Sequence, residues 1–197
     1  MKKPVKAKKA KKKAKSVKAS PYYAQSKRLG FRLLAADDAA LYCGLYTDAK
    51  TLEHVCPPLS AERAKQSFEK AMRASYTKPW LQRISVVVER TSKKPLGIAS
   101  IRLIDADKRI AEVGILLKPN AQSQRYATEA SLALITSAFR RHTIEGIFAK
   151  VGVTHKTGER LVKTLGYARG ADLAATADRT ARSTWSMNRE TWADNFK

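Results

Sequence analysis

Apolar residues alternate with polar ones along several short segments of the chain, and this period of two is typical of half-buried β-strands. Polar turns such as TSKK at 91–94 and DADK at 105–108 separate some of these segments. The pattern predicts strands at 27–34, 83–90, 95–104, 109–118, 146–153 and 182–190. Because three of them follow one another across short turns, we expect an antiparallel meander in the middle of the chain.

Other segments repeat their apolar residues at helical spacing. They predict helices at 35–48, 57–75, about 126–142 and 157–167. Asp37 and Asp38 lie at the start of the first, where carboxylates suit the helix dipole. Ser60 is a typical N-cap for the second, although Arg63 stands where a glutamate would complete a capping box, and Gly166 ends the last. The order βααβββαβαβ predicts one domain of the α/β (α+β) class, with a mixed, largely antiparallel sheet and helices on both faces.

Charge divides the chain into two parts. Its 197 residues hold 39 Lys and Arg against 17 Asp and Glu, a net charge of +22. Ten of the lysines lie in residues 1–20, which hold no acidic residue, so the remainder carries 29 − 17 = +12. A segment of Lys and Ala without apolar periodicity cannot bury enough surface to offset the entropy of ordering it. We therefore predict a disordered tail at 1–22 and a folded domain at 23–197.

Membrane and secreted classes fit the sequence poorly. No run approaches the ~20 apolar residues of a membrane span, and the lysine-rich start lacks the apolar segment of a secretory signal. Cys43 and Cys56 stand in no metal-type or redox-type spacing, so we expect reduced thiols and no metal site. These observations indicate a soluble, cytoplasmic protein without membrane contacts.

The most specific pattern lies at 109–130, which reads RIAEVGILLKPNAQSQRYATEA. It resembles the central segment of the GNAT N-acetyltransferases, particularly the branch that acetylates ribosomal-protein N-termini, in which an xEIGY strand and a proline precede GKGYATEA. Three more segments resemble that branch in the same order: RLGFRLLAADDAALYCGLYTD at 28–48, THKTGERLVKTLGY at 154–167 and TWSMNRETW at 184–192. The similarity covers about 27–192, and four segments in the family's order make it specific.

The resemblance implies an N-acetyltransferase that uses acetyl-CoA as co-substrate and transfers its acetyl group to a primary amine of a protein N-terminus or a small molecule. Two alternatives stay open. One is an enzyme of the same fold that inactivates an amine-bearing antibiotic or toxin. The other is a non-catalytic GNAT-like fold that binds nucleic acid or acidic partners through its basic tail, by weak and salt-dependent phosphate contacts. The order of the segments favours an enzyme, and the oligomeric state is left open.

The turn before the central helix contains the implied cofactor-binding residues. GNAT proteins have Q/R-x-x-G-x-G/A there, and backbone N–H groups at the positive end of the helix point at the pyrophosphate of an acyl-CoA. The corresponding residues here, with the one that follows, are Gln122, Ser123, Gln124, Arg125, Tyr126, Ala127 and Thr128. Gln122 and Ala127 match the family. Arg125 replaces the central glycine, which removes conformational freedom and adds a cation that could meet a phosphate.

Glu112 is the catalytic residue that the resemblance implies. Alternation along its strand places Glu112, Gly114 and Leu116 on one face. In the family this carboxylate faces the amine and takes its proton, usually through water, so that the lone pair can attack the thioester. Such a base is needed because an amine with a pKa of ~8 to ~10 is mostly protonated at pH 7. The backbone of Ile115, Leu116 and Leu117 would pair with the pantetheine arm.

The segment after the next strand departs furthest from the family. His155 replaces an asparagine that contacts the pantetheine arm, and Gly158 replaces a serine. Val162 stands where the family often has the tyrosine that protonates the leaving thiolate, so the general acid is unassigned. His155 and Arg160 remain implied cofactor contacts. Tyr42 and Tyr46, one helical turn apart, are candidates for the acceptor side, where the family's first helix lies; single aromatic residues are more often part of the core.

Overall fold

The alternating segments form one sheet in a computed structural model that describes residues 20–122, 124–141 and 143–196. Eight strands in this part of the chain are ordered β1-β2-β3-β4-β5-β6-β8-β7. They are β1 (Ala24–Gln25), β2 (Leu29–Leu33), β3 (Gln82–Glu89), β4 (Pro95–Asp105), β5 (Ile110–Leu117), β6 (Gly146–Gly152), β7 (Ala168–Leu173) and β8 (Arg182–Asn188). All neighbours pair antiparallel except β5 and β6, which are parallel. The predicted mixed, largely antiparallel sheet is therefore confirmed.

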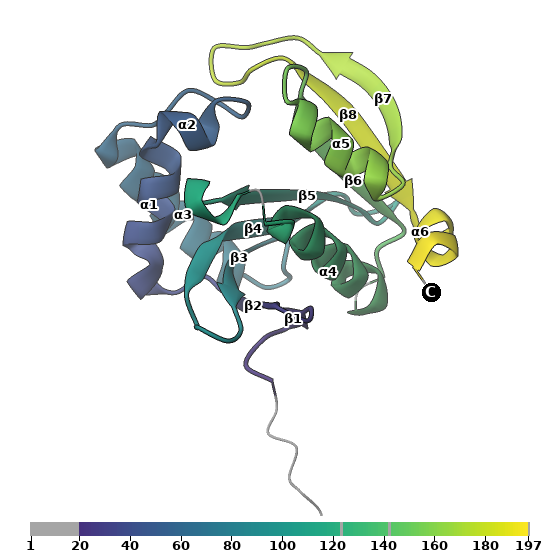
Figure 1. The fold of residues 1–197 in the computed structure, drawn as a ribbon, viewed down its shortest axis with the longest axis horizontal. Coiled ribbons are helices and arrows are strands. Elements are labelled where there is room, and N and C mark those ends of the chain that lie inside the picture. Colours follow the sequence, from purple (N-terminus) through teal and green to yellow (C-terminus); the bar gives the residue numbers. More distant parts are fainter. Residues whose placement is uncertain (1–19, 123, 142, 197) are drawn as a thin grey trace, which may run out of the picture.

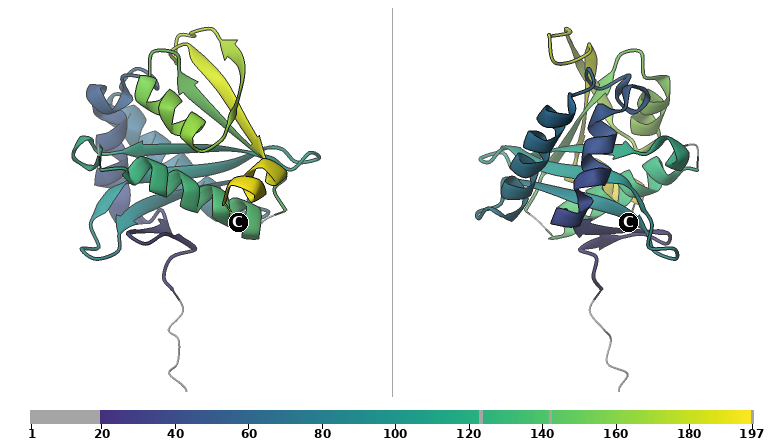
Figure 2. Two further views of the ribbon diagram at one scale, coloured as in Figure 1. Left: turned by 45° about the vertical axis from the view of Figure 1, so that its right-hand side comes forward. Right: turned by 90° about the vertical axis from the view of Figure 1, so that its left-hand side faces the viewer.

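Helices cover both faces of the sheet, as predicted (Figures 1 and 2). They are η1 (Ala36–Asp38), α1 (Ala39–Thr47), α2 (Ala49–Leu52), α3 (Ala61–Tyr76), η2 (Pro119–Ala121), α4 (Tyr126–Arg141), α5 (Lys156–Thr164) and α6 (Arg189–Phe196). We call the face that α1 and α3 cover the α1 face, and the face that α4 and α5 cover the α4 face. The residues buried under α1 and α3 include Leu34, Ile84, Val86 and Ile98.

The α4 face holds most of the core. α4 contributes Ala130 and Leu134 to a cluster over the first strands, and Ile135 and Phe139 to a second cluster over β5, β6 and β8. Trp185 of β8 is the largest fully buried side chain of the described residues. The apolar residues on two sides of α4 therefore each meet their own part of the sheet.

The end signals read from the sequence lie where they were predicted. The Ser60 hydroxyl accepts a hydrogen bond from the backbone N–H of Arg63 and caps α3. Gly166 follows α5 with φ of 80°, a left-handed conformation that glycine adopts without steric cost. Asp38 has a second role besides its favourable position at the start of the helix dipole. Its buried carboxylate forms an ion pair with Arg32 at 2.7 Å and accepts a hydrogen bond from the N–H of Ala35, which connects the first helix to β2.

Five elements were not predicted: β1, α2, η2, β7 and α6. β1, α2 and η2 are too short to show a period, and β7 is an exposed strand whose residues do not alternate. The predicted first helix ends at Thr47 because the Asp48 carboxylate caps α2 through the N–H of Thr51. The final strand stops at Asn188 and continues directly as α6. Such boundaries depend on local hydrogen bonds that periodicity does not show.

Most of the predicted tail, residues 1–19, lies outside the described residues, and its disorder stays a prediction. At the predicted end of the tail, Tyr22 packs against the core cluster under α1. Cys43 and Cys56 are free thiols, half-buried and buried respectively. In the part of the chain that the structure describes, no helix is long and apolar enough to cross a membrane.

Candidate active site

The sheet opens between β5 and β6. These strands pair over three residues, from Ile110 opposite Gly146 to Glu112 opposite Phe148. Beyond that point β5 continues to Leu117 alongside β4, whereas β6 continues to Gly152 alongside β8. In Figure 2, left, β6 and β8 run diagonally away from β4 and β5. We call this opening the β5–β6 gap.

The wall of the gap on the β5 side is backbone. Within a sheet, every second residue of a strand directs its N–H and C=O toward each neighbour. Beyond Glu112 only β4 is a neighbour of β5 in the described structure. The segment that contains Ile115, Leu116 and Leu117 therefore offers main-chain donors and acceptors to an extended ligand. Their side chains alternate as predicted, with Ile115 and Leu117 packed on the α4 face and Leu116 on the α1 face.

The predicted phosphate turn lies at the end of β5 and leads into the N-terminus of α4. Arg125 has φ of 60°, a left-handed conformation that favours glycine, the residue of the family pattern at this position. Its carbonyl accepts the N–H of Glu129, which starts the helix. The Arg125 side chain is exposed, and among the described residues no hydrogen bond or ion pair holds it. The cation is available to a ligand at the helix terminus.

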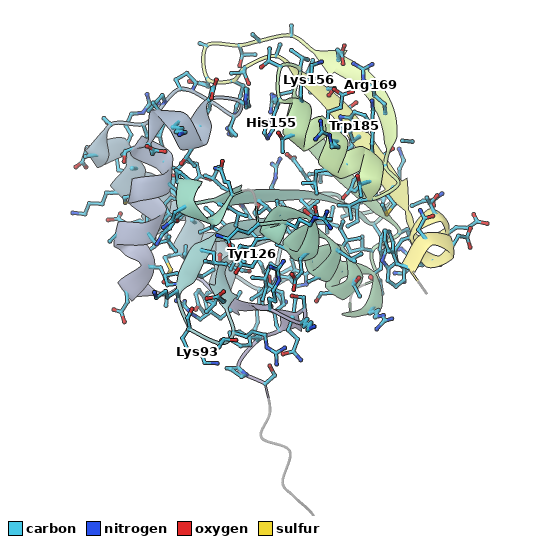
Figure 3. All side chains as sticks on the ribbon, in the orientation of Figure 1. Lys93, Tyr126, His155, Lys156, Arg169 and Trp185 are labelled. Atoms are coloured by element: carbon cyan, nitrogen blue, oxygen red, sulfur yellow. The ribbon has the colours of Figure 1, made fainter. Side chains whose placement is uncertain are left out.

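The neighbours of Arg125 shape this turn. The side-chain amide of Gln122 donates to the carbonyl of Leu117 at 3.3 Å, and that of Gln124 donates to Asn120. Tyr126 is buried and its hydroxyl donates to Glu89 at 2.7 Å, so the ring anchors the start of α4 (Figure 3). Ala127 and Thr128 occupy the first helical turn with their side chains half-buried. Ser123 lies outside the described residues.

Glu129 was missed as a site-building residue. Its carboxylate accepts from the Arg28 guanidinium at 2.6 Å, from the Ser26 hydroxyl at 2.6 Å and from the N–H of Arg28. Although burial would raise its pKa, these bonds hold the pKa of Glu129 below its ordinary value. They fix the N-terminus of α4 against the corner between β1 and β2. In the sequence, only the YATEA motif drew attention to Glu129. The motif does not indicate that this glutamate pairs with residues about a hundred positions earlier in the chain.

Replacing Arg125 with glycine is expected to raise the free energy of unfolding by about 0.5 to 1 kcal/mol, because a side chain at φ of 60° is strained and glycine is not. Arg125→Ala, which keeps a Cβ at the same backbone position, is the matched control and should change stability by less than ~0.5 kcal/mol. Urea denaturation of both variants measures the difference. A glycine variant less stable than wild type would contradict the argument from strain.

Glu112 lies where the β5–β6 gap begins and is half-buried on the α1 face. Arg102 Nη2 lies 2.6 Å from its Oε2, and Lys150 Nζ lies 3.2 Å from the same oxygen. Burial alone would raise the pKa of Glu112, but the hydrogen bonds and charges of Arg102 and Lys150 outweigh it and hold that pKa below its ordinary value. Glu112 is thus an ionised carboxylate in a cationic setting. Among the described residues no hydrogen bond reaches its Oε1.

His155 begins α5 at the far end of the gap, on the side that faces α2 (Figure 3). Its ring stacks on that of His54 at 4.4 Å between centroids. Burial, with the charge of His54, holds the pKa of His155 below its ordinary value. Gly158 makes room for this ring, since a Cβ there would lie 2.4 Å from His155 Cδ2. The two departures from the family pattern, His155 and Gly158, are therefore sterically coupled, because the histidine ring occupies the space that a Cβ at position 158 would fill.

His54, which the sequence reasoning did not single out, belongs to the loop after α2. Its carbonyl accepts from Thr180, and its ring nitrogen Nδ1 lies 3.2 Å from the Thr154 hydroxyl. A Cβ on Gly152 would lie 2.6 Å from the same carbonyl, so the loop rests directly on the end of β6. This loop from the first half of the chain thus packs against the C-terminal end of β6, the strand that forms one side of the gap. No pattern around His54 indicated the contact, because its partners are distant in the sequence.

The remaining residues that the sequence singled out lie on two helices, α5 and α1. Val162 is buried in the core under α4, and Arg160 is exposed on α5. Tyr42 and Tyr46 pack together on α1 with ring centroids 4.6 Å apart. Tyr42 is buried and its hydroxyl bonds Ser67, while burial raises the pKa of Tyr46 above its ordinary value. Val162 cannot supply a proton, and Tyr42 is part of the core.

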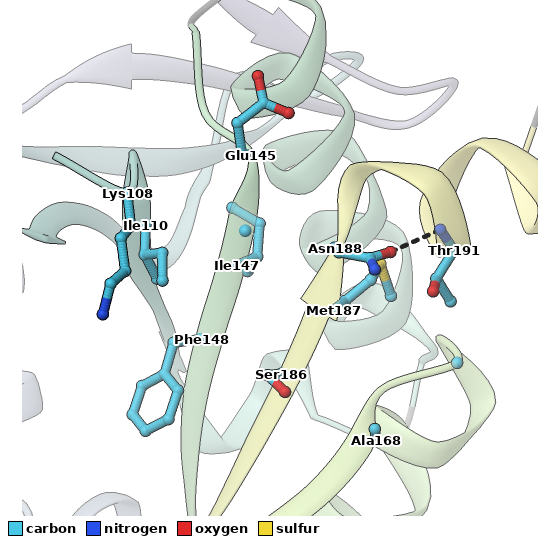
Figure 4. Close-up of a pocket in the computed structure, with 12 residues that line it drawn as sticks. Lys108, Ile110, Glu145, Ile147, Phe148, Ala168, Ser186, Met187, Asn188 and Thr191 are labelled. Carbon is cyan, nitrogen blue, oxygen red and sulfur yellow. Dashed lines mark hydrogen bonds between the residues drawn. The ribbon is translucent and has the colours of Figure 1, made fainter. Parts of the chain in front are cut away.

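Two hollows lie outside the gap. One, of about 390 Å³, extends over the start of β6 and the end of β8, with Phe148 and Ile110 on its walls (Figure 4). The other, of about 600 Å³, lies between α1 and the segment that holds Lys118 and Pro119. Neither contains Glu112 or Arg125, so neither coincides with the predicted site. An open gap between diverging strands need not form an enclosed hollow, so the predicted site lies at the strand divergence and not in either hollow.

The fold and the divergent strands define a class of protein. Residues 28–168 match the acetyltransferase (GNAT) domain family, and the chain belongs to that family. The match includes β2, the whole meander, the phosphate turn, α4, β6 and α5. Among curated proteins no sequence matches this chain significantly.

Solved structures share the fold over nearly their whole length. A GNAT acetyltransferase from Bacillus anthracis is 15% identical, with 85% of this chain and 98% of that chain covered and a TM-score of 0.72. A spermidine N-acetyltransferase from Vibrio cholerae, in complex with CoA and spermine, is 16% identical over 85% and 99% of the chains, with a TM-score of 0.72. An acetyltransferase from Salmonella typhimurium that modifies the N-terminal serine of ribosomal protein L7/L12 is 15% identical over 83% and 96%, with a TM-score of 0.70. These similarities show the fold.

Proposed function

We propose that this protein is a cytoplasmic N-acetyltransferase that transfers the acetyl group of acetyl-CoA to a primary amine. The observation that carries the proposal is the β5–β6 gap, which runs from Glu112 to the N-terminus of α4. Acetyl-CoA is a long ligand with an amide-containing arm and a pyrophosphate. The gap offers backbone groups along the wall formed by 113–117, followed by a helix N-terminus, so the chain's own groups fit that shape and chemistry.

The phosphate end of the ligand would lie at the turn before α4. The first N–H groups of a helix lack intrahelical partners and carry partial positive charge, which favours an anion. Arg125 adds an exposed cation at the same point. The left-handed backbone there supports the proposal, since this is the conformation for which the family pattern has glycine. Arg160, exposed on α5, is a second candidate for a phosphate contact.

The acetyl end would lie near Glu112. When bound, acetyl-CoA supplies a thioester whose carbonyl carbon an amine can attack. Glu112 would hold a water or the amine itself at Oε1 and take up the proton, directly or through that water. Its ion pairs keep it ionised, and they also make it a weak base, so a relay to solvent fits better than lasting protonation. His155 would donate a hydrogen bond to the ligand from the opposite wall. No residue is assigned as the acid for the leaving thiolate.

The acceptor is a primary amine, and the resemblance to enzymes that acetylate ribosomal-protein N-termini makes a protein amino terminus the first class to test. The Vibrio cholerae relative was solved with spermine, which makes polyamines the second. For the lysine-rich residues 1–20 we propose weak, salt-dependent contact with nucleic acid.

Calorimetric titration with acetyl-CoA, followed by an assay for free thiol with a panel of primary amines, tests the proposal. We expect saturable binding of one acetyl-CoA per chain and thiol release that depends on an amine. Arg125→Ala and Arg125→Gly should each weaken binding by about 1 to 3 kcal/mol if the cation meets a phosphate. Tighter binding by the glycine variant would show that the arginine hinders the ligand. Absence of acetyl-CoA binding to the folded wild-type protein would refute the proposal.

A further inference from the structure

The charged side chains beside the gap indicate which chemical class of acceptor the site favours. Glu112 is a single carboxylate, and both Arg102 and Lys150 bind its Oε2. The cluster of three therefore carries a net charge of about +1 at the point where the acceptor amine would attack. Arg102 is half exposed, so solvent screens it more than Lys150, whose side chain is 24% exposed. Lys150 is the less screened of the two positive charges.

A second cation lies on the same face, one strand further on. Lys150 pairs with Thr184, and Gly152 pairs with Arg182, so Lys150 and Arg182 are diagonal neighbours on the α1 face of β6 and β8. Among the described residues, no carboxylate lies within ion-pair distance of Arg182. Its Nε is buried without a hydrogen-bond partner. An N–H of a guanidinium that is removed from water without an acceptor is costly, and an oxygen from a ligand would remove that cost.

Among the described residues, neither Glu53 nor Asp178 lies within ion-pair distance of Lys150 or Arg182. Asp172 of β7 pairs with Arg169 at 2.7 Å. The pair formed by Lys150 and Arg182 thus faces the acceptor side without a carboxylate of its own other than Glu112, which Lys150 shares with Arg102.

We infer that the acceptor is a primary amine that carries an anionic group, a carboxylate or a phosphate, close to the amine, and that Lys150 and Arg182 bind that group. The inference rests on the proposed function, since it places the amine at Glu112. A polyamine fits this arrangement poorly because its second ammonium would lie against two cations. The net charge of +12 outside the first twenty residues acts in the same direction, as it attracts anionic molecules over longer distances.

Matched peptides test the inference. Three tetrapeptides with the same free amino terminus differ at the second residue, which is Asp, Asn or Lys; a fourth carries phosphoserine there, and free aspartate and spermidine complete the set. With saturating acetyl-CoA, kcat/KM for thiol release should be at least ~10-fold higher for Asp than for Asn, and lower still for Lys. The phosphoserine peptide shows whether a phosphate is a better anionic group than a carboxylate. Free aspartate shows whether a single amino acid is a better acceptor than a peptide. Equal values for Asp and Asn, or a preference for Lys or spermidine, would overturn the inference.

Variants assign the preference to the two cations. Arg182→Gln should reduce the ratio of kcat/KM between the Asp and Asn peptides by at least ~5-fold, whereas Arg182→Lys should keep most of it. Lys150→Gln should reduce it too, and Lys70→Gln, on the exposed side of α3, should leave it unchanged. A ratio unaffected by both Arg182→Gln and Lys150→Gln in folded protein would refute the assignment.

The two proposals fail in different ways. If acetyl-CoA does not bind, the proposed function fails and the peptide assay is not reached. If acetyl-CoA binds but no peptide reacts, equilibrium binding of the Asp and Asn peptides to the CoA complex, measured by calorimetry, replaces the rate. Tighter binding of the Asp peptide that Arg182→Gln abolishes would support the inference, and equal binding would refute it.

Discussion

Glu112→Gln is expected to lower turnover by ~10² to ~10⁴ at neutral pH while the affinity for acetyl-CoA changes little. Glutamine has nearly the same shape but cannot accept a proton, so it weakens the transition state and not the binding of the co-substrate. The pKa of Glu112 lies below its ordinary value, so the wild-type carboxylate is ionised at neutral pH. The rise of the wild-type rate with pH should therefore follow the acceptor amine and not Glu112.

The matched control for this variant is Glu159→Gln. Glu159 also pairs with lysines, Lys163 at 2.8 Å among them, but lies on α5 away from the start of the gap. Its replacement should leave turnover within ~2-fold of wild type, since its ion pairs with Lys156 and Lys163 are screened by solvent. Thermal melting of both variants shows whether the loss of the Arg102 and Lys150 partners affects folding. If Glu112→Gln keeps near wild-type turnover across the pH range, Glu112 is not the base.

Trp185→Ala is expected to lower the free energy of unfolding by about 3 to 5 kcal/mol, because it leaves a large cavity in the core. Trp185 is 2% exposed, and its indole N–H donates to the Ser183 hydroxyl at 2.8 Å. It packs on the α4 face with Phe139, Ile147 and Met187. Because β8 supports β6 along its whole length, the cavity would also weaken one wall of the gap. The melting temperature should fall by about 10 °C or more.

Ser186→Ala is the control for the tryptophan. Ser186 is the next residue of β8, is exposed and lies on the opposite face, so its replacement should change stability by less than ~0.5 kcal/mol. Denaturant unfolding followed by circular dichroism measures both variants. A loss below ~1 kcal/mol for Trp185→Ala would mean that the region under β8 repacks readily and is not a rigid support for the gap.

Much of the fold could be read from local patterns. Alternation located the six inner strands of the sheet and missed the two edge strands β1 and β7, and helical spacing located α1, α3, α4 and α5. The predicted roles of Ser60 and Gly166 were confirmed at the start of α3 and after α5, because capping depends on a few adjacent residues. The GNAT family was likewise evident from four segments, and the match over 28–168 confirms it.

The site was less accessible from the sequence, and the roles of the residues named for it stay predictions. The structure places Glu112 where β5 and β6 separate and Arg125 directly before α4. The backbone conformation of Arg125 could not be read from its identity, since arginine rarely adopts a positive φ. The sequence left open whether Arg125 preserves or weakens the turn, and the structure shows this arginine in a left-handed conformation that glycine adopts without steric cost.

Contacts between distant segments were decided by the folded chain alone. The ion pairs of Glu112 join three strands, and the His54 ring reaches His155 across a hundred residues. The basicity of a carboxylate depends on which charges lie within a few ångströms of it. Those charges are set by the register of the strands and not by the residues next to it in the sequence. Local physics thus determines which elements form and where they end, whereas the charge and shape of the gap follow from how those elements meet.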